Sequence, residues 1–410
     1  MINSHYVPQF ILKKFSNKLS LYNIHTGELA EDINVDKAYS QKGFYDDDTE
    51  KNLNLKLESQ FSNLLANKLL KAENIIELNR AELKLVKKFI LISTLRSLGN
   101  ELFLQKEKRF YVDSIEHWRN FCCQHNISAE ECESAVKEMQ PPFEEKQISG
   151  ETPHDYWMRT LNVILDTDGS PGEIFNHPDK TYPAYRWAQI IAAGYLGFWD
   201  SEFKHDEFVI TDIGMTSENE KGWNGVTVYN SKKLLFLIDL LKKEKDSEFI
   251  KILQNQIYLQ EFFHENFEMY PISAKRMIVE ISPFYKFRQM YSWRYKMPEL
   301  KDLTEIPNEN LFAPNLAAYV KPQTDALIPQ YDTDDLYIYD IKKLSSAETR
   351  YCNELFLDRI NTHLGFSSLR KVVRSIVQYK RDNSYPYTPR VDYTNLYKII
   401  EERYGGDLNV

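Results

Sequence analysis

The spacing of apolar residues changes along this chain, and the change limits the folds that are open to it. Apolar side chains recur at helical spacing in residues 46–72, after the acidic and threonine residues Asp48 and Thr49 that could cap a helix. A longer helical pattern runs from about residue 80 to residue 124. Three later segments continue it, at residues 128–139, 155–165 and 185–199. The spacing therefore predicts a mainly helical first half.

Strand-like patterns open the chain and return after residue 200. Residues 19–24 and 28–35 flank a short His-Thr-Gly segment, and Gly27 can supply the positive φ that a hairpin turn requires. β-branched and aromatic runs then predict central strands at residues 207–215, 268–282 and 335–341. Helical patterns follow at residues 346–364, 366–382 and 392–404, the last after a proline-rich break.

These patterns predict an α+β protein that is mainly helical, with a small β-sheet fed by the N-terminal hairpin and the central strands. A chain of 410 residues exceeds the length at which a single core usually stops growing. We therefore expect either one large mixed domain or two lobes packed as a unit. The lobes would be residues 1–200, with the hairpin and the long helix, and residues 201–410, with mixed strands and helices ending in helices.

Charge and composition restrict the partners. The chain has 60 acidic against 51 basic residues, so it cannot coat nucleic acid with its whole surface, and any contact with a polyanion must be local. The most apolar stretches, residues 88–95 and 187–199, fall short of the roughly 20 residues that span a bilayer, so we expect no membrane partner. Four cysteines without disulfide spacing, and no leader pattern, predict a cytoplasmic protein.

Metal sites have weak support in the sequence, and no common nucleotide-binding or hydrolase motif is present. Zinc ligands could come from a histidine and cysteine cluster, but two of its cysteines are adjacent and would point to different sides of a helix, so buried inert thiols are the simpler interpretation. That cluster is His117, Cys122, Cys123, His125 and Cys132. The acidic segments 166–173 and 331–337 lack a complete cation-loop pattern and are interpreted as turns and caps.

A basic helix face is predicted near the C-terminus. In residues 366–382, one stripe is apolar and would be buried, and a second face carries Arg370, Arg374, Gln378 and Arg381. Arginines four residues apart can present two guanidinium groups to phosphates, and Asn361 and His363 just upstream could add polar contacts. The alternative is a solvated helix face whose cations pair with acidic side chains of the same chain. The sequence leaves both interpretations open.

His5 opens the run HYVPQFILKKF and also has two interpretations. As a structural residue, a neutral imidazole would bond to the backbone within a buried segment. As a site residue, it would act as a general base or metal ligand, with Gln9 as an orienting amide and Lys13 and Lys14 supplying positive charge.

Several motifs follow one another along the chain. They begin with HYVPQFILKKFS, a hairpin, KAYSQKGFY and a helix with Leu57 and Glu58, and continue with LISTLRS, which contains Arg96. FVITDIG, EMYPIS and RINTHLGFSSLRKVVRS follow in order. In these motifs the chain resembles the bacterial family called domain of unknown function 4238, over about residues 4 to 378. A serine-aspartate-asparagine-proline signature of the family is here Thr211-Asp212-Ile213-Gly214, so only the aspartate is kept.

The resemblance implies a bacterial cytoplasmic protein of undefined biochemistry, in a family with some members among anti-phage defence genes. We therefore expect a defence protein, as a nuclease-like toxic effector acting on nucleic acid or a nucleotide. The alternative is a sensor or scaffold without chemistry of its own, which binds a phage or partner protein.

A set of polar residues would carry the nuclease chemistry. His5 would move protons, Glu58 and Asp212 would hold a divalent metal or act as bases, and arginines would neutralise the phosphate. The catalytic candidates are His5, Gln9, Glu58 and Asp212, and the candidates for binding phosphate or nucleic acid are Arg96, Asn361, Arg370 and Arg374. This hypothesis requires that the ends of the chain meet, with His5 within reach of Arg370 or Arg374.

Overall fold

A computed structural model describes seven parts of the chain. The described residues are 3–96, 128–130, 152–166, 195–219, 265–281, 336–381 and 391–405. They form a mixed α and β structure, so the predicted class is confirmed at that level, and the predominance of helix stays a prediction. Among the described residues, no helix has the length and apolar character needed to cross a membrane.

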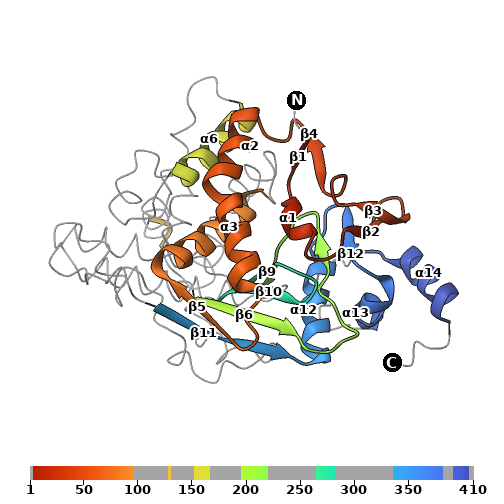
Figure 1. Cartoon of the computed structure of the whole chain (residues 1–410). Helices are drawn as coiled ribbons and strands as arrows, with labels where there is room; N and C mark the ends of the chain where they lie inside the picture. The colour runs from red at the N-terminus through yellow and green to blue at the C-terminus, as the bar shows by residue number, and fades with distance from the viewer. Residues whose placement is uncertain are drawn as a thin grey trace.

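The largest sheet has six strands in the order β5-β11-β6-β10-β9-β8 (Figure 1). All neighbouring strands are antiparallel except β11 and β6, which run parallel. The strands are β5 (Ile75–Asn79), β6 (Tyr195–Ser201), β8 (Thr216–Asn219), β9 (Glu265–Pro271), β10 (Arg276–Ile281) and β11 (Leu336–Leu344).

The N-terminal hairpin shares a sheet with only one of the predicted central strands, which corrects the expectation of one small sheet. Ile210–Thr211, within the predicted strand 207–215, belongs to the hairpin's sheet, whereas the segments 268–282 and 335–341 supply strands of the six-stranded sheet. The hairpin pairs with two short later strands in the order β3-β2-β12-β7. Gly27 has φ +71° in its turn, as predicted. The strands are β2 (Lys18–Asn23), β3 (Leu29–Asn34), β7 (Ile210–Thr211) and β12 (His363–Phe366). A separate pair joins β1 (Asn3–His5) to β4 (Ser40–Lys42).

Helices occupy most of the positions that periodicity predicted within the described residues. Asp46 caps the first long segment by accepting the Thr49 backbone N–H at 2.6 Å, in place of the expected Asp48 or Thr49 caps. Residues 80–96 form the described part of the long helix. The others are α1 (Gln9–Leu12), α2 (Asp47–Leu53), η1 (Asn54–Glu58), α3 (Ser59–Leu64), η2 (Leu65–Leu69), α6 (Pro153–Asp166), α12 (Ser346–Asp358), α13 (Leu369–Arg381) and α14 (Thr394–Tyr404); η1 and η2 are π-helical.

Two predicted helices are wrong in part. Residues 195–199, expected to end a helix, belong to the central strand β6, which pairs with β10 and β11. The helix expected over 346–364 ends at Asp358, and His363–Phe366 form β12 between β2 and β7. In both places the chain pairs with strands distant in sequence, and a short apolar run cannot distinguish a buried strand from a helix.

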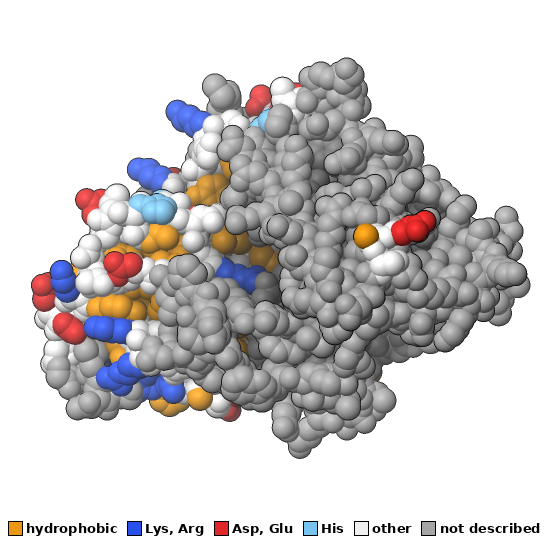
Figure 2. All heavy atoms as spheres, turned by 180° about the vertical axis from the view of Figure 1, so that it is seen from behind, with side chains coloured by type: hydrophobic (Ala, Val, Ile, Leu, Met, Phe, Trp, Pro, Cys, Tyr) orange, Lys and Arg blue, Asp and Glu red, His pale blue; other side chains and the backbone are white. Residues whose placement is uncertain are grey.

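At its centre the six-stranded sheet is buried on both faces. Phe198 belongs to one core cluster and its neighbour Trp199 to the other, as expected when successive residues of a strand point to opposite faces. The helices α12, α13 and α14 contribute to the second cluster and lie at one side of the molecule (Figure 1). On that side, the face seen from behind carries Lys and Arg side chains next to hydrophobic ones (Figure 2).

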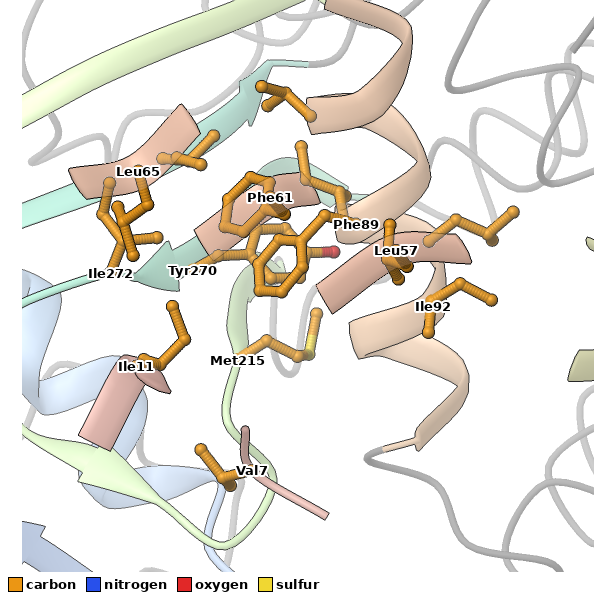
Figure 3. Packing of buried hydrophobic residues seen from close by; sticks show 14 of the residues in the cluster. Val7, Ile11, Leu57, Phe61, Leu65, Phe89, Ile92, Met215, Tyr270 and Ile272 are labelled. Atoms are coloured by element: carbon orange, nitrogen blue, oxygen red, sulfur yellow. The ribbon is translucent and has the colours of Figure 1, made fainter. Parts of the chain in front are cut away.

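The first core cluster joins the helices of the N-terminal part to the sheet (Figure 3). Phe61 of α3 and Phe89 stack with ring centroids 3.8 Å apart, and Tyr270 of β9 and Ile272, just after that strand, pack beside them. Each of the two clusters combines residues from both sides of position 200. The division into lobes at that position stays a prediction.

Candidate functional site

Three of the predicted site residues meet around one buried guanidinium group. Arg96, on the helix of residues 80–96, is 2% exposed. Its Nη1 atom donates to Glu58 Oε1 at 2.5 Å, and its Nη2 atom donates to the His5 backbone oxygen at 2.6 Å. Its Nε atom donates to the Tyr45 hydroxyl at 2.8 Å. Arg96 therefore connects β1, the end of η1 and the segment before α2.

The Arg96 charge is kept despite its burial. Burial would lower the pKa of Arg96, but the neighbouring Tyr45 and Glu58 raise it above the ordinary arginine value. The guanidinium also lies 5.3 Å from the centroid of the Tyr45 ring. A buried arginine without such partners would be costly, so Tyr45 and Glu58 make its position possible.

His5 presents a neutral imidazole next to this arginine. Burial lowers the pKa of His5 below its ordinary value, while the backbone groups of Asp36 and Val35 act in the opposite direction. Its Nε2 atom is buried and has no hydrogen-bond partner within the described part of the chain. Because the pKa of His5 is lowered, the neutral form of its imidazole is favoured at neutral pH.

Glu50 belongs to the same cluster around Arg96, although it was not among the predicted site residues. Burial raises the pKa of Glu50 even though the charge of Arg96 lowers it. Its Oε2 atom is buried and, like His5 Nε2, lacks a hydrogen-bond partner among the described residues. One signal was present in the sequence, because Glu50 precedes Glu58 by roughly two helical turns and both carboxylates can then lie on similar faces. No comparable spacing in the sequence pointed to Tyr45.

Asp212 and Asn361, two further predicted site residues, are in contact with each other. The Asp212 carboxylate accepts the backbone N–H groups of Asn361 at 3.1 Å and Thr362 at 2.7 Å, so Asn361 contributes its backbone and not the predicted amide. Burial raises the pKa of Asp212, and these backbone bonds oppose the rise. Burial and the Asp212 charge raise the pKa of Tyr6 to about 12, and Tyr6 directly follows His5. Asp212 therefore lies near the N-terminal strand.

Arg370 and Arg374 lie in a third place, on α13. Arg370 is exposed, and the Arg374 guanidinium lies 5.1 Å from the centroid of the Phe203 ring. Gln378, predicted on the same face, instead accepts the Arg350 Nε–H at 2.7 Å and faces α12. Gln9 is half-buried on α1.

The described contacts do not bring His5 together with the arginines of α13. β1 pairs with β4, whereas α13 packs against α12 and α14. Figure 1 shows β12 between β1 and α13. The described contacts therefore give no support for the single cleft that we expected from the sequence, which stays a prediction.

The segments in which the sequence gave weak support for a metal site lie mainly outside the described residues. Within the described ranges, no three histidine, cysteine, aspartate or glutamate side chains are placed to hold a metal ion. The acidic segments 166–173 and 331–337 are described only at Asp166 and at residues 336–337. His117, Cys122, Cys123, His125 and Cys132 lie outside the described residues.

Comparison with known proteins gives one family. The model described as "Protein of unknown function (DUF4238)" matches residues 3–364. No curated protein and no solved structure matches the chain. The match includes His5, Glu58, Arg96 and Asp212, whereas α13 lies beyond it.

Proposed function

This chain belongs to the DUF4238 family of proteins of unknown function, and from that premise we propose that it is a bacterial anti-phage defence protein of the cytoplasm. We propose that it acts as a nuclease-like toxic effector on nucleic acid. The resemblance supports the defence context, and the side chains around Arg96 support the proposed chemistry.

One observation carries the nuclease assignment. Residues 5, 58 and 96 are far apart in sequence, yet Arg96 bonds both the Glu58 carboxylate and the His5 backbone oxygen, and the buried Nε2 atom of the His5 imidazole has no hydrogen-bond partner among the described residues. An imidazole in that state can accept the proton of an attacking hydroxyl group. Perturbed titratable groups that gather in this way are typical of catalytic sites.

The proposed step assigns a base and an acid. The step requires that water or a substrate hydroxyl group reach the buried Nε2 atom of His5. That nitrogen takes the proton, and the oxygen forms a bond to phosphorus as the bond to the leaving oxygen breaks. The leaving oxygen takes a proton from the Glu50 carboxyl, since burial favours its protonated form. His5 then returns its proton to Glu50 through solvent. Arg370 and Arg374 would hold the phosphates of the bound strand.

Glu58 and Asp212 are assigned positioning roles. Glu58 pairs with Arg96, and Asp212 accepts two backbone N–H groups, so both carboxylates already have strong partners. Binding of a divalent metal by Glu58 and Asp212 stays a prediction. The roles that the sequence suggested for Gln9 and Asn361 stay predictions as well.

The experiment compares wild type, His5→Ala, Glu50→Gln and Arg374→Ala in cells with and without phage, following growth and the integrity of RNA and DNA. We expect wild type to degrade nucleic acid and His5→Ala and Glu50→Gln to lose both toxicity and defence. His25→Ala is the matched control, because His25 is exposed in the hairpin turn and should stay active. A folded His5→Ala protein with full defence activity would show that the catalytic assignment is wrong.

A non-catalytic sensor or scaffold is the second candidate, and one surface favours it. Ile75 of β5 and Leu336 and Ile338 of β11 are 50%, 60% and 50% exposed at the end of the six-stranded sheet. Exposed apolar side chains that gather in this way are typical of protein-binding surfaces. A sensor would co-purify with a phage protein while nucleic acids stay intact, and Leu336→Ser would abolish that binding.

A further inference from the structure

An exposed aromatic ring lies next to basic side chains where β6 ends. Phe203 is 40% exposed, and the Arg374 guanidinium lies 5.1 Å from its ring centroid. The exposed His205 ring meets Phe203 in a T-shaped contact with centroids 5.6 Å apart. Lys204 between them is also exposed. Neither Phe203 nor His205 was singled out by the sequence, because nothing in the segment EFKH distinguishes it from an ordinary surface loop.

Hydrogen bonds and an ion pair fix the loop that carries Phe203. Lys275, in the turn between β9 and β10, donates from Nζ to the backbone oxygen of Phe203 at 2.8 Å and also to that of Asp206. Lys371 of α13 pairs with Glu207, which is 4% exposed. These bonds fix the loop against α13, so the ring and the arginine are positioned before any ligand arrives.

The local charge is positive although the chain carries a net charge of -9. Among the described residues, Arg370 and Arg374 form no ion pair, in contrast to Lys371. A helix face is neutral when acidic side chains pair with all of its cations. In the described residues such a pair forms at Lys371 but not at Arg370 or Arg374. The side of the molecule with α12–α14 shows basic and hydrophobic side chains together in Figure 2.

We propose that Phe203, His205, Arg370 and Arg374 form a binding surface for single-stranded nucleic acid. Unpaired bases stack on aromatic rings and on guanidinium planes, while lysine and arginine side chains follow the phosphates. A duplex hides its base faces, so it could use only the charges of this surface. The inference rests on the proposed function in one respect, since it names the substrate class of the nuclease.

The test measures binding of fluorescein-labelled 12-nucleotide RNA and DNA single strands, and of the matching duplexes, by fluorescence anisotropy. The protein is the full chain carrying His5→Ala, and a gel confirms that the oligonucleotides stay intact. We expect single strands to bind at least about tenfold more tightly than duplexes. Phe203→Ala should weaken single-strand binding about tenfold, and Phe203→Tyr should restore it, because stacking needs only the ring.

Two further variants separate charge from stacking. Arg374→Gln should weaken binding and lower the dependence on salt concentration by about one ion, whereas Lys18→Gln, an exposed change in β2, should do neither. Equal binding of duplex and single strand, or unchanged binding by Phe203→Ala, would overturn the inference. If the oligonucleotides bind as expected but wild type cuts no nucleic acid, the surface stands and only the nuclease proposal fails.

Discussion

Arg96 donates a 2.6 Å hydrogen bond to the backbone oxygen of His5, so an arginine on the helix of residues 80–96 fixes the position of the first strand. Through the same guanidinium, His5 is held at a constant relation to Glu58 and Tyr45. The proposed base therefore depends on Arg96 for its position, and damage to Arg96 should affect both stability and activity.

Arg96→Met is expected to lower the free energy of unfolding by about 3–5 kcal/mol, because removal of one partner leaves the Glu58 charge without its buried counter-ion. Urea unfolding followed by circular dichroism measures the change. Lys56→Gln is the control, since Lys56 forms an exposed pair with Asp166 and should cost less than about 1 kcal/mol. Equal midpoints for the two variants would mean that the Arg96 cluster contributes little to the fold.

Asp212→Ala is expected to cost about 2–3 kcal/mol, because it leaves the N–H groups of Asn361 and Thr362 without their acceptor. Asp212→Asn keeps one side-chain oxygen and should cost less. Thermal unfolding of the two variants provides the comparison. Asp392→Ala serves as a control for an exposed acceptor, since Asp392 accepts the Thr394 N–H at 2.8 Å near the surface. An equal loss for Asp212→Ala and Asp392→Ala would contradict the role assigned to burial.

Periodicity predicted those parts of the fold that depend on local sequence. The helix over residues 155–165 appears as α6, and Gly27 marks the hairpin turn. Periodicity predicted helix at β6 and β12, where pairing with distant strands decides the structure. Local propensity cannot express that pairing, because its hydrogen bonds join residues far apart in the chain.

The candidate site was predictable in its residues but not in its arrangement. The family resemblance pointed to His5, Glu58 and Arg96, which do meet. It could not place Arg374, because the position of α13 follows from its packing on α12 and not from spacing along the chain. Glu50 escaped notice for a similar reason, since an acidic residue in a helix is ordinarily solvated and only its orphaned carboxylate oxygen reveals its burial.

Gly365→Ala is expected to destabilise the four-stranded sheet, since the new Cβ atom would lie 2.3 Å from the Tyr39 hydroxyl oxygen. That hydroxyl donates to the Ile210 backbone oxygen at 3.0 Å, so relief of the clash breaks a buried hydrogen bond. Together the overpacking and the lost bond should cost about 2–4 kcal/mol in urea unfolding. In the double variant Tyr39→Phe with Gly365→Ala, the hydroxyl is absent and part of the loss should be recovered. No recovery would show that the clash lies elsewhere.

The pH dependence of stability should report on His5. Burial lowers the pKa of His5 in the folded chain, whereas the imidazole of the unfolded chain titrates near 6.5. Between those two values the unfolded chain takes up a proton that the folded chain does not, so stability falls as the pH drops below about 6.5. The loss stops once the folded imidazole is protonated as well. Burial also lowers the pKa of His363, which adds a contribution of the same sign.

His5→Gln should therefore make the protein less sensitive to acid between pH 7.5 and 5.5. The difference in free energy of unfolding between these two pH values should shrink by at most about 1.4 kcal/mol per pH unit below 6.5. Urea unfolding at both values measures it, and His363→Gln provides a second variant that should reduce the difference independently. The opposite slope, with His5→Gln losing more stability in acid than wild type, would mean that the folded His5 is charged and cannot serve as the base.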